Sequence, residues 1–171
     1  MSPPKPRIGV LFVCYANVCR SPLAEGLLRE LARQRGGDLL DRLDIDSAGT
    51  SAMDGASPHP LSRAIAGEHG FTLAGEARQL VRDDLTRFDH VVVMDRQNLA
   101  TIERLAAPSA FGSLAGYRAK IRLLRAIANP KAKGRDLDVP DPIGKDARGY
   151  AEVYALLEAG CNALLDELAR A

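Results

Sequence analysis

The chain has 171 residues, of which 46% are hydrophobic and 26% are charged, and its formal net charge is +1. This length suits one globular domain with a substantial core, and the composition is that of ordinary globular proteins. The balanced charge, without any basic block, excludes the electrostatic footprint of a nucleic-acid-binding protein. We expect a single domain over residues 7–171, preceded at 1–6 by a flexible tail whose prolines prevent strand pairing.

Short apolar runs alternate with helical patterns along the chain. Residues 8–13 (IGVLFV) are nearly all apolar, as in a strand buried on both faces, and leucines then recur every four residues from Leu23 until the glycines at 36–37. The further expected elements are a strand at 43–47, a helix at 58–69, a strand at 88–94, a helix at 98–106, a strand at 119–124, a long surface loop at 129–146 and a last helix with Val153, Leu157, Cys161, Leu164 and Leu168 on its apolar face. This alternation predicts an α/β domain with a parallel sheet between helices.

Cysteine usage and the first residues bear on the compartment. Three cysteines, at 14, 19 and 161, are too few for a disulfide scaffold, and the odd number fits a reducing environment. The first residues lack the apolar segment and the cleavage site of a secretory signal, and no stretch approaches the length of a membrane span. We expect a cytoplasmic protein without membrane contact, with export by a route that needs no signal peptide as the alternative.

The segment CYANVCRSP, from Cys14 to Pro22, joins the first strand to the first helix. In open parallel sheets, ligands bind beyond the carboxyl ends of the strands, where this segment lies. Ser21 is a favoured N-cap residue and Pro22 a favoured first helical residue, so the N–H groups of the loop can form an anion site at a helix N-terminus. This positive end favours the thiolate form of Cys14, and the planar guanidinium of Arg20 can hold two phosphoryl oxygens.

The spacing of Cys14 and Arg20 is a weak signal by itself, because an arginine-rich chain produces it by chance. Its position between a buried strand and a capped helix gives it weight. A nucleophile at the start of a loop and an anion clamp at its end indicate phosphoryl transfer. The alternative is that Cys14 is a small buried residue that closes the strand.

The loop resembles the signature of the low-molecular-weight protein tyrosine phosphatases, which usually reads C-x-G-N-x-C-R-S-P. The positions that match it are Cys14, Asn17, Cys19, Arg20, Ser21 and Pro22. Other landmarks of the family follow in order: DSAGT at 46–50, ARQ at 77–79, FD at 88–89, MD at 94–95, NL at 98–99 and DP at 141–142. The resemblance covers about residues 7–168. It implies a three-layer domain with a four-stranded parallel sheet, a phosphate-binding loop after the first strand, and a reaction through phosphocysteine without metal or cofactor.

The resemblance also assigns roles to individual residues. Cys14 is expected to attack phosphorus, and Arg20 with the loop amides to stabilise the equatorial oxygens. Asp141 is expected to protonate the leaving group and then to activate water, and Asn17 to hold the strained loop. The other phosphate-binding and loop-supporting residues implied are Tyr15, Ala16, Val18, Cys19, Ser21 (whose hydroxyl bonds the thiolate) and Ser47.

Two of these assignments have plain structural alternatives. Asp-Pro in a polar loop is common turn chemistry, so without the resemblance Asp141 is read as a turn residue. Its order in the chain and its loop favour the catalytic role, and Asp138 is a nearby decoy. In the family, the second cysteine of the loop can form a reversible disulfide with the nucleophile. This gives Cys19 a redox role, with simple packing beneath the loop as the alternative. Cys161 is expected to be a core residue.

The chain departs from the family pattern where a substrate ring would lie. Ala16 replaces the usual glycine, and Ile143 follows the Asp-Pro pair, where aromatic residues are common. Gly75 stands where eukaryotic members often have a histidine, so a contact that supports Asn17 is expected to be missing. The expected substrate rim is apolar enough for a phenyl ring but less aromatic than usual, and consists of Tyr15, Met53 and Ile143.

The expected function is hydrolysis of phosphate monoesters, with protein phosphotyrosine or a small aryl phosphate as substrate, by a monomer or weak dimer. Arsenate reductases share the loop but need further cysteines, and the distal cysteine here, Cys161, lies on an apolar helix face. Phosphoarginine phosphatases resemble the loop but carry threonine in place of Val18. A catalytically idle phosphate-binding protein is the remaining alternative. No metal is expected, because His59, His69 and His90 lack ligand spacing.

Overall fold

The computed structural model describes residues 5–108 and 117–171, which fold around a four-stranded parallel sheet with the strand order β2-β1-β3-β4. The strands are β1 (Ile8–Cys14), β2 (Leu43–Gly49), β3 (His90–Val93) and β4 (Lys120–Leu123). β1 pairs in parallel with both β2 and β3, so the strand that ends in Cys14 is central. The α/β fold with a four-stranded parallel sheet is confirmed.

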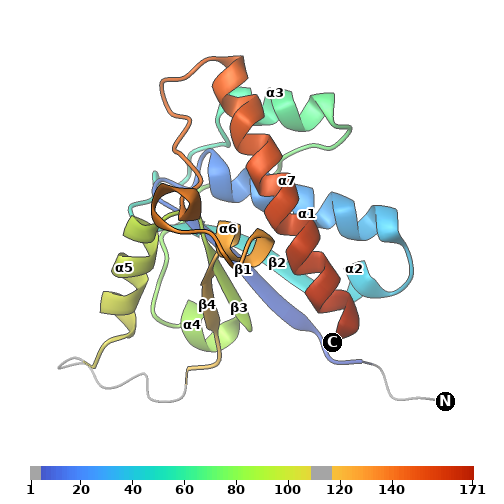
Figure 1. Cartoon of the computed structure of the whole chain (residues 1–171), viewed down its shortest axis with the longest axis vertical. Coiled ribbons are helices and arrows are strands. Elements are labelled where there is room, and N and C mark those ends of the chain that lie inside the picture. Colours follow the sequence, from blue (N-terminus) through green and yellow to red (C-terminus); the bar gives the residue numbers. More distant parts are fainter. Residues whose placement is uncertain (1–4, 109–116) are drawn as a thin grey trace.

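Helices cover both faces of the sheet (Figure 1). One face carries α1 and α7, with α2, α3 and α6 packed beside them, and the other face carries α4 and α5. The bounds are α1 (Arg20–Arg35), α2 (Leu39–Arg42), α3 (Pro60–Glu68), α4 (Asp84–Arg87), α5 (Arg96–Ala106), α6 (Leu124–Ala128), the 3-10 helix η1 (Gly134–Leu137) and α7 (Ala147–Arg170). The described chain is therefore a three-layer domain.

The apolar run of β1 is explained by burial on both faces. Successive strand residues point to opposite sides, so Val10 and Phe12 pack with α1 and α7, whereas Leu11 and Val13 pack with α4 and α5. All four side chains are fully buried. Cys14 follows on the α1 and α7 side, at the carboxyl end of the sheet.

Differences from the sequence expectation concern short elements. β3 and β4 are shorter than expected, and α2, α4 and α6 were not expected, because four or five residues cannot display a helical period. The expected surface loop at 129–146 contains η1 and also the fully buried Val139. Of the expected tail at 1–6, residues 1–4 lie outside the described residues, and residues 5–6 have no regular structure.

Helix α7 is long but amphipathic. Its expected apolar face is confirmed, since Val153, Leu157, Cys161, Leu164 and Leu168 are all buried, which makes Cys161 a core residue.

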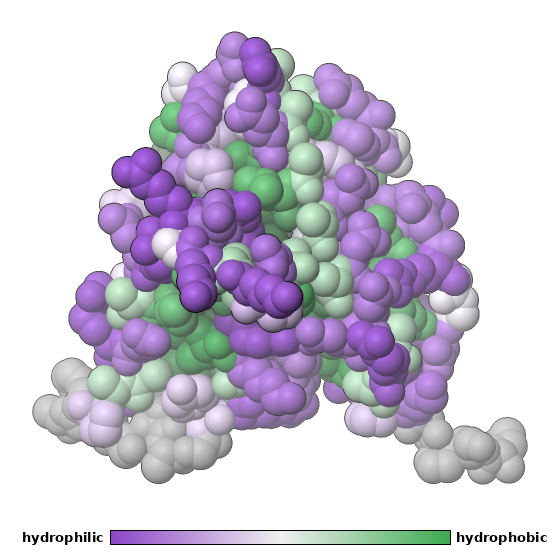
Figure 2. Space-filling model, in the orientation of Figure 1, coloured by the Kyte–Doolittle hydropathy of each residue, from purple (hydrophilic) through white to green (hydrophobic). Residues whose placement is uncertain are grey.

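The face of the molecule in Figure 2 is mainly hydrophilic, with hydrophobic residues in the hollows between elements. Among residues 5–108 and 117–171, no helix combines the length and the apolar character needed to cross a membrane.

Candidate active site

The loop after β1 lies against the end of β2. Backbone N–H groups of residues 50, 51 and 53 donate to the carbonyl oxygens of Cys14, Tyr15 and Ala16 at 2.9, 2.8 and 3.1 Å. A Cβ atom on Gly49 would lie 2.6 Å from the carbonyl oxygen of Tyr15 and 3.0 Å from the Asn17 nitrogen. Only glycine therefore allows this close approach of loop and strand.

The start of α1 corrects the expectation for Ser21. The helix begins at Arg20, its N-cap residue is Cys19, and no side chain caps it. The Ser21 hydroxyl is used elsewhere: its Oγ lies 2.9 Å from Cys14 Sγ and accepts a hydrogen bond of 2.8 Å from Asn17 Nδ2. Pro22 is the third helical residue, tolerated because the first N–H groups of a helix have no partner within it. The first turn thus keeps N–H groups without a side-chain cap, as an anion site requires.

Asn17 supports the loop with its whole side-chain amide. Its φ of 58° lies in the left-handed region, which asparagine tolerates better than most residues. Nδ2 also donates to Ser47 Oγ at 3.0 Å, and Oδ1 accepts from the backbone nitrogen of Arg78 at 2.9 Å. These contacts support Asn17 although Gly75 offers no side chain. Ser47, expected to support the loop, and the Arg78 backbone, which was not expected, hold Asn17 without a histidine.

The hydrogen bonds around Ser21 leave its hydroxyl proton available for donation. Ser47 Oγ donates to Glu25 Oε2 at 2.6 Å, since a carboxylate can only accept. The two Nδ2 hydrogens of Asn17 serve Ser47 and Ser21, so the Ser21 hydroxyl keeps its own proton to donate. Two acceptors lie within its reach, Cys14 Sγ at 2.9 Å and the Ala48 carbonyl oxygen at 3.4 Å, and the shorter contact is the one to sulfur. A donor aimed at sulfur stabilises a thiolate at this position.

Arg20 is a buried cation with several acceptors; its side chain is 2% exposed. Nη1 donates to Asp95 Oδ2 at 2.7 Å and to the Val139 carbonyl oxygen at 2.9 Å. Nη2 lies 3.5 Å from Asp141 Oδ2. These partners compensate the cost of burying a charge and fix the plane of the guanidinium. From the sequence, Asp95 is only a landmark of the family, although its position two residues after β3, at the same end of the sheet as Cys14, is a usable signal.

Asp141 approaches Arg20 from the far end of the chain. Its Oδ1 accepts a hydrogen bond of 3.1 Å from the Ile143 nitrogen, so the residue does form a turn. Its side chain is 46% exposed and its other oxygen faces Arg20. The same conformation therefore forms the turn and brings the Asp141 carboxyl group to Arg20. A small cavity is lined by Cys14, Ala16, Val18, Cys19, Arg20, Asp141 and Ile143.

The three expected rim residues are more than half exposed, at 56%, 57% and 53% for Tyr15, Met53 and Ile143. Ile143 lines the cavity that contains Cys14, and Tyr15 lines a neighbouring pocket of about 330 Å³ against α5. Met53 lines neither pocket, although its backbone nitrogen bonds the loop. The structure therefore brings two of the three rim residues beside the cysteine.

Cys19 lies beneath the loop, 3% exposed. Its sulfur is 3.3 Å from the hydroxyl oxygen of Tyr150, whose ring stacks on His59 with centroids 5.2 Å apart. Burial is the main cause that raises the pKa of the Cys19 thiol above its ordinary value. Sequence reasoning missed Tyr150, because a helix tyrosine 131 residues away gives no local signal.

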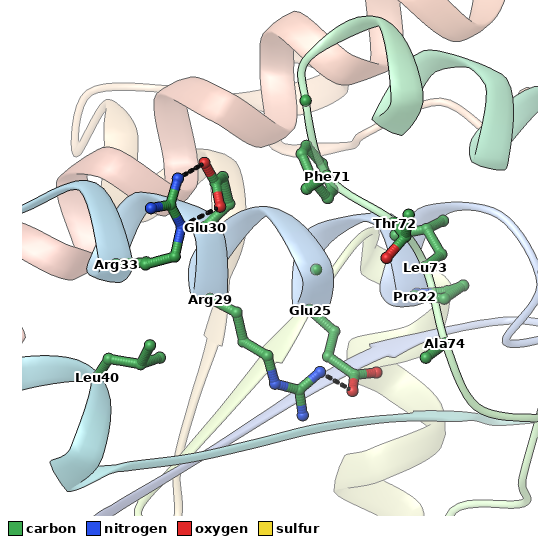
Figure 3. Close-up of a pocket in the computed structure, with 12 residues that line it drawn as sticks. Pro22, Glu25, Arg29, Glu30, Arg33, Leu40, Phe71, Thr72, Leu73 and Ala74 are labelled. Carbon is green, nitrogen blue, oxygen red and sulfur yellow. Dashed lines mark hydrogen bonds and ion pairs between the residues drawn. The ribbon is translucent and has the colours of Figure 1, made fainter.

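A larger pocket, of about 570 Å³, lies on the outer side of α1, between α2 and residues 70–74 (Figure 3). Its charged side chains pair with one another, Glu25 with Arg29 and Glu30 with Arg33. It contains none of the expected site residues. Glu25 connects it to the cysteine by hydrogen bonds that run through Ser47, Asn17 and Ser21.

Histidines and carboxylates do not gather as metal ligands. His59 caps α3 and His69 stacks on Tyr154 with ring centroids 3.8 Å apart, whereas His90 begins β3. In the two described ranges, no three His, Cys, Asp or Glu side chains are placed to hold a metal ion.

Comparison with known proteins gives a consistent result. The family model described as low molecular weight phosphotyrosine protein phosphatase matches residues 9–171. The low molecular weight protein-tyrosine-phosphatase of Streptomyces coelicolor is 38% identical over 157 residues, which are 91% of this chain and 90% of that protein. The crystal structure of YfkJ from Bacillus subtilis is 32% identical with a TM-score of 0.80 and covers 97% of both chains. An arginine phosphatase of drosophila is 29% identical with a TM-score of 0.80, covering 92% of this chain and 96% of its own. This chain therefore belongs to the low molecular weight phosphotyrosine protein phosphatase family.

Proposed function

We propose that this protein hydrolyses phosphate monoesters, chiefly phosphotyrosine in proteins, through a cysteinyl-phosphate intermediate. The observation that carries the proposal is the convergence of Cys14, Arg20 and Asp141 on one small cavity at the carboxyl end of the sheet. A protein that only binds phosphate would need neither a thiol nor a carboxyl group in that position. Family membership supports the same chemistry.

In the first step, the thiolate of Cys14 attacks phosphorus, so that an S–P bond forms while the P–O bond to the leaving group breaks. Asp141 in its protonated form gives its proton to the departing oxygen. The Ser21 hydroxyl, which lies 2.9 Å from the sulfur, stabilises the thiolate before attack. In the second step, water attacks phosphorus and gives a proton to the Asp141 carboxylate. The S–P bond breaks, and phosphate and the thiolate are released.

Arg20 is suited to the negative charge of the phosphoryl group. Asp95 and the Val139 carbonyl hold its Nη1, whereas Nη2 makes only the longer contact of 3.5 Å with Asp141. The edge formed by Nε and Nη2 can therefore turn to two phosphoryl oxygens. The uncapped N–H groups at the start of α1 add further donors. Together they supply the electrostatic stabilisation of the transition state without a metal ion.

The substrate class follows from the surroundings of the cavity. Ile143 presents apolar surface in the cavity that contains Cys14, and the exposed ring of Tyr15, the next residue along the chain, lines the pocket against α5. Apolar surface of this kind suits a phenyl ring. Phosphoarginine is the second candidate, because the chain also resembles the arginine phosphatase of drosophila. Val18 stands where phosphoarginine phosphatases have threonine, which favours phosphotyrosine.

An arsenate reductase is less well supported. Such an enzyme passes a disulfide to a distal cysteine, but Cys161 is fully buried and its sulfur donates to the carbonyl oxygen of Ala24 at 3.8 Å. Burial raises the pKa of the Cys161 thiol well above its usual range, so it is a poor nucleophile.

We infer a cytoplasmic protein of a single domain, monomeric or weakly dimeric, since its free cysteines suit a reducing compartment.

The proposed substrate class predicts an order of turnover. Phosphotyrosine peptides should be hydrolysed faster than matched phosphoserine and phosphoarginine peptides, because the rim accommodates a ring and Val18 offers no hydroxyl. Faster turnover of phosphoarginine would transfer the assignment to the second candidate.

Phosphate release measured with and without EDTA should be equal, since Arg20 and the loop amides provide the positive field. EDTA inhibition that zinc or magnesium reverses would contradict the mechanism.

Mild peroxide should inactivate the enzyme reversibly. Peroxide converts the Cys14 thiolate to sulfenic acid, and the Cys19 thiol then condenses with it, forming a disulfide and releasing water. Because burial raises the pKa of Cys19, its thiolate fraction is small near neutral pH, and disulfide closure should become faster as the pH rises. Mass spectrometry of samples quenched over time measures the closure.

Thiol reductant should restore the activity of the oxidised wild type. Cys19→Ser should be inactivated by peroxide at a similar initial rate, but its Cys14 should then be oxidised irreversibly, beyond sulfenic acid. A disulfide between Cys14 and Cys161, or none at all, would leave Cys19 with a packing role only.

A further inference from the structure

The segment that leads to Asp141 is docked on the first turn of α5 by an ion pair. Arg96 Nε and Nη2 donate to the two carboxylate oxygens of Asp138 at 3.1 and 2.8 Å. The backbone nitrogen of Arg96 donates to the same carboxylate at 2.9 Å. Arg125 Nη1 donates to the carbonyl oxygen of Asp138 at 3.0 Å. Asp138 is thus held through both its side chain and its backbone.

The next residue is fixed from the opposite side. Val139 is fully buried, and its nitrogen donates to the carbonyl oxygen of Met94 at 2.7 Å. Its carbonyl oxygen accepts from Arg20 Nη1 at 2.9 Å. Between Val139 and Asp141 stands only Pro140, whose ring fixes φ. The position of residues 138–139 therefore determines where the carboxyl group of Asp141 lies.

Asp138 itself is unsuited to be the general acid. Its hydrogen bonds with Arg96 hold the pKa of Asp138 below its usual value. Both carboxylate oxygens already accept hydrogen bonds from Arg96, so a proton on either one would have to displace that contact. Its contacts are those of an anchor, directed at the N-terminus of a helix, where a negative charge is favoured.

We propose that Arg96 and Asp138 are positioning residues that dock the acid-bearing segment 138–142 on α5 and so place Asp141 for proton transfer. This inference rests on the proposed function. An exposed ion pair alone contributes little, and these side chains are 49% and 26% exposed. Here the pair is bidentate and is supplemented by a backbone N–H donor, so it restricts direction as well as distance. Proton transfer depends on the distance and direction between the acid and the leaving oxygen, so a shift of this segment would slow it.

The test is Arg96→Ala in the full chain, assayed on aryl phosphates whose leaving groups range from nitrophenol to phenol. We expect kcat to fall about tenfold on phenyl phosphate and less than about twofold on p-nitrophenyl phosphate, because only the poor leaving group needs the acid. A uniform loss on all substrates, or no loss, would overturn the inference. Absence of wild-type activity on any substrate would instead overturn the proposed function.

Companion variants separate positioning from general damage. Asp138→Asn keeps the side-chain volume and should reproduce the selective loss, and the double variant should lose no more than either single one. Arg96→Lys should recover part of the activity, since one N–H···O contact remains possible. Arg35→Ala is the control: it removes a surface pair with Asp166 of 2.6 Å, between α1 and α7, and should leave the selectivity unchanged. A near-complete loss in Asp138→Asn with a normal Arg96→Ala would make Asp138 the acid and overturn the inference.

Discussion

Cys14→Ser is expected to reduce turnover by at least about three orders of magnitude while phosphate and vanadate still bind. A serine hydroxyl is not ionised near neutral pH, so it cannot attack phosphorus as a thiolate does. The substitution removes little volume at a side chain that is 2% exposed, and Asn17 and Ser21 keep their other contacts. Steady-state hydrolysis of p-nitrophenyl phosphate measures the loss, and calorimetric titration with vanadate measures binding.

Cys161→Ala is the control for loss of a buried cysteine. Cys161 lies in the core between α1 and α7, so its truncation should lower thermal stability but leave kcat close to the wild-type value. Retention of more than a trace of turnover in Cys14→Ser would rule out a covalent phosphocysteine. Loss of vanadate binding together with activity would show that the loop had changed shape.

The sequence predicted where the site lies because the signals involved are local. The apolar run of β1, the leucine repeat of α1 and the rule that ligands bind at the carboxyl end of a parallel sheet suffice to place the loop. Strand and helix boundaries were less exact, and the helices of four or five residues carry no readable period. Tertiary packing, which one sequence does not display, determines those ends.

The partners within the site could not be read in the same way. The local preference of Ser21 predicts a cap for α1, which is wrong, whereas its contact with Cys14, seven residues earlier, agrees with what the family resemblance implies. Asp95 and Val139 reach Arg20 across 75 and 119 residues of sequence. Asp138 was taken for a decoy near Asp141, because its pairing with Arg96 depends on how the loop returns to α5. Such long-range pairs need the fold before they can be stated.

Asp141→Asn should reduce kcat by about 10²–10⁴-fold on phenyl or alkyl phosphates and much less on p-nitrophenyl phosphate. A basic leaving oxygen needs a proton as the P–O bond breaks, whereas nitrophenolate departs nearly unaided. Asparagine keeps the hydrogen bond from the Ile143 nitrogen, so the turn should survive. The slope of log kcat against leaving-group basicity, measured over a series of aryl phosphates, should become steeper.

The matched control for Asp141→Asn is Asp136→Asn. Asp136 is exposed in η1, five residues earlier in the same loop, and it lies outside the ion pair that makes Asp138 unsuitable as a neutral control. Asp136→Asn should keep the wild-type slope. Asp141→Asn with an unchanged slope would mean that another group protonates the leaving oxygen. A steep slope in Asp136→Asn would show instead that loss of any negative charge in this loop disturbs the site, and Asp141 would lose its assignment as the acid.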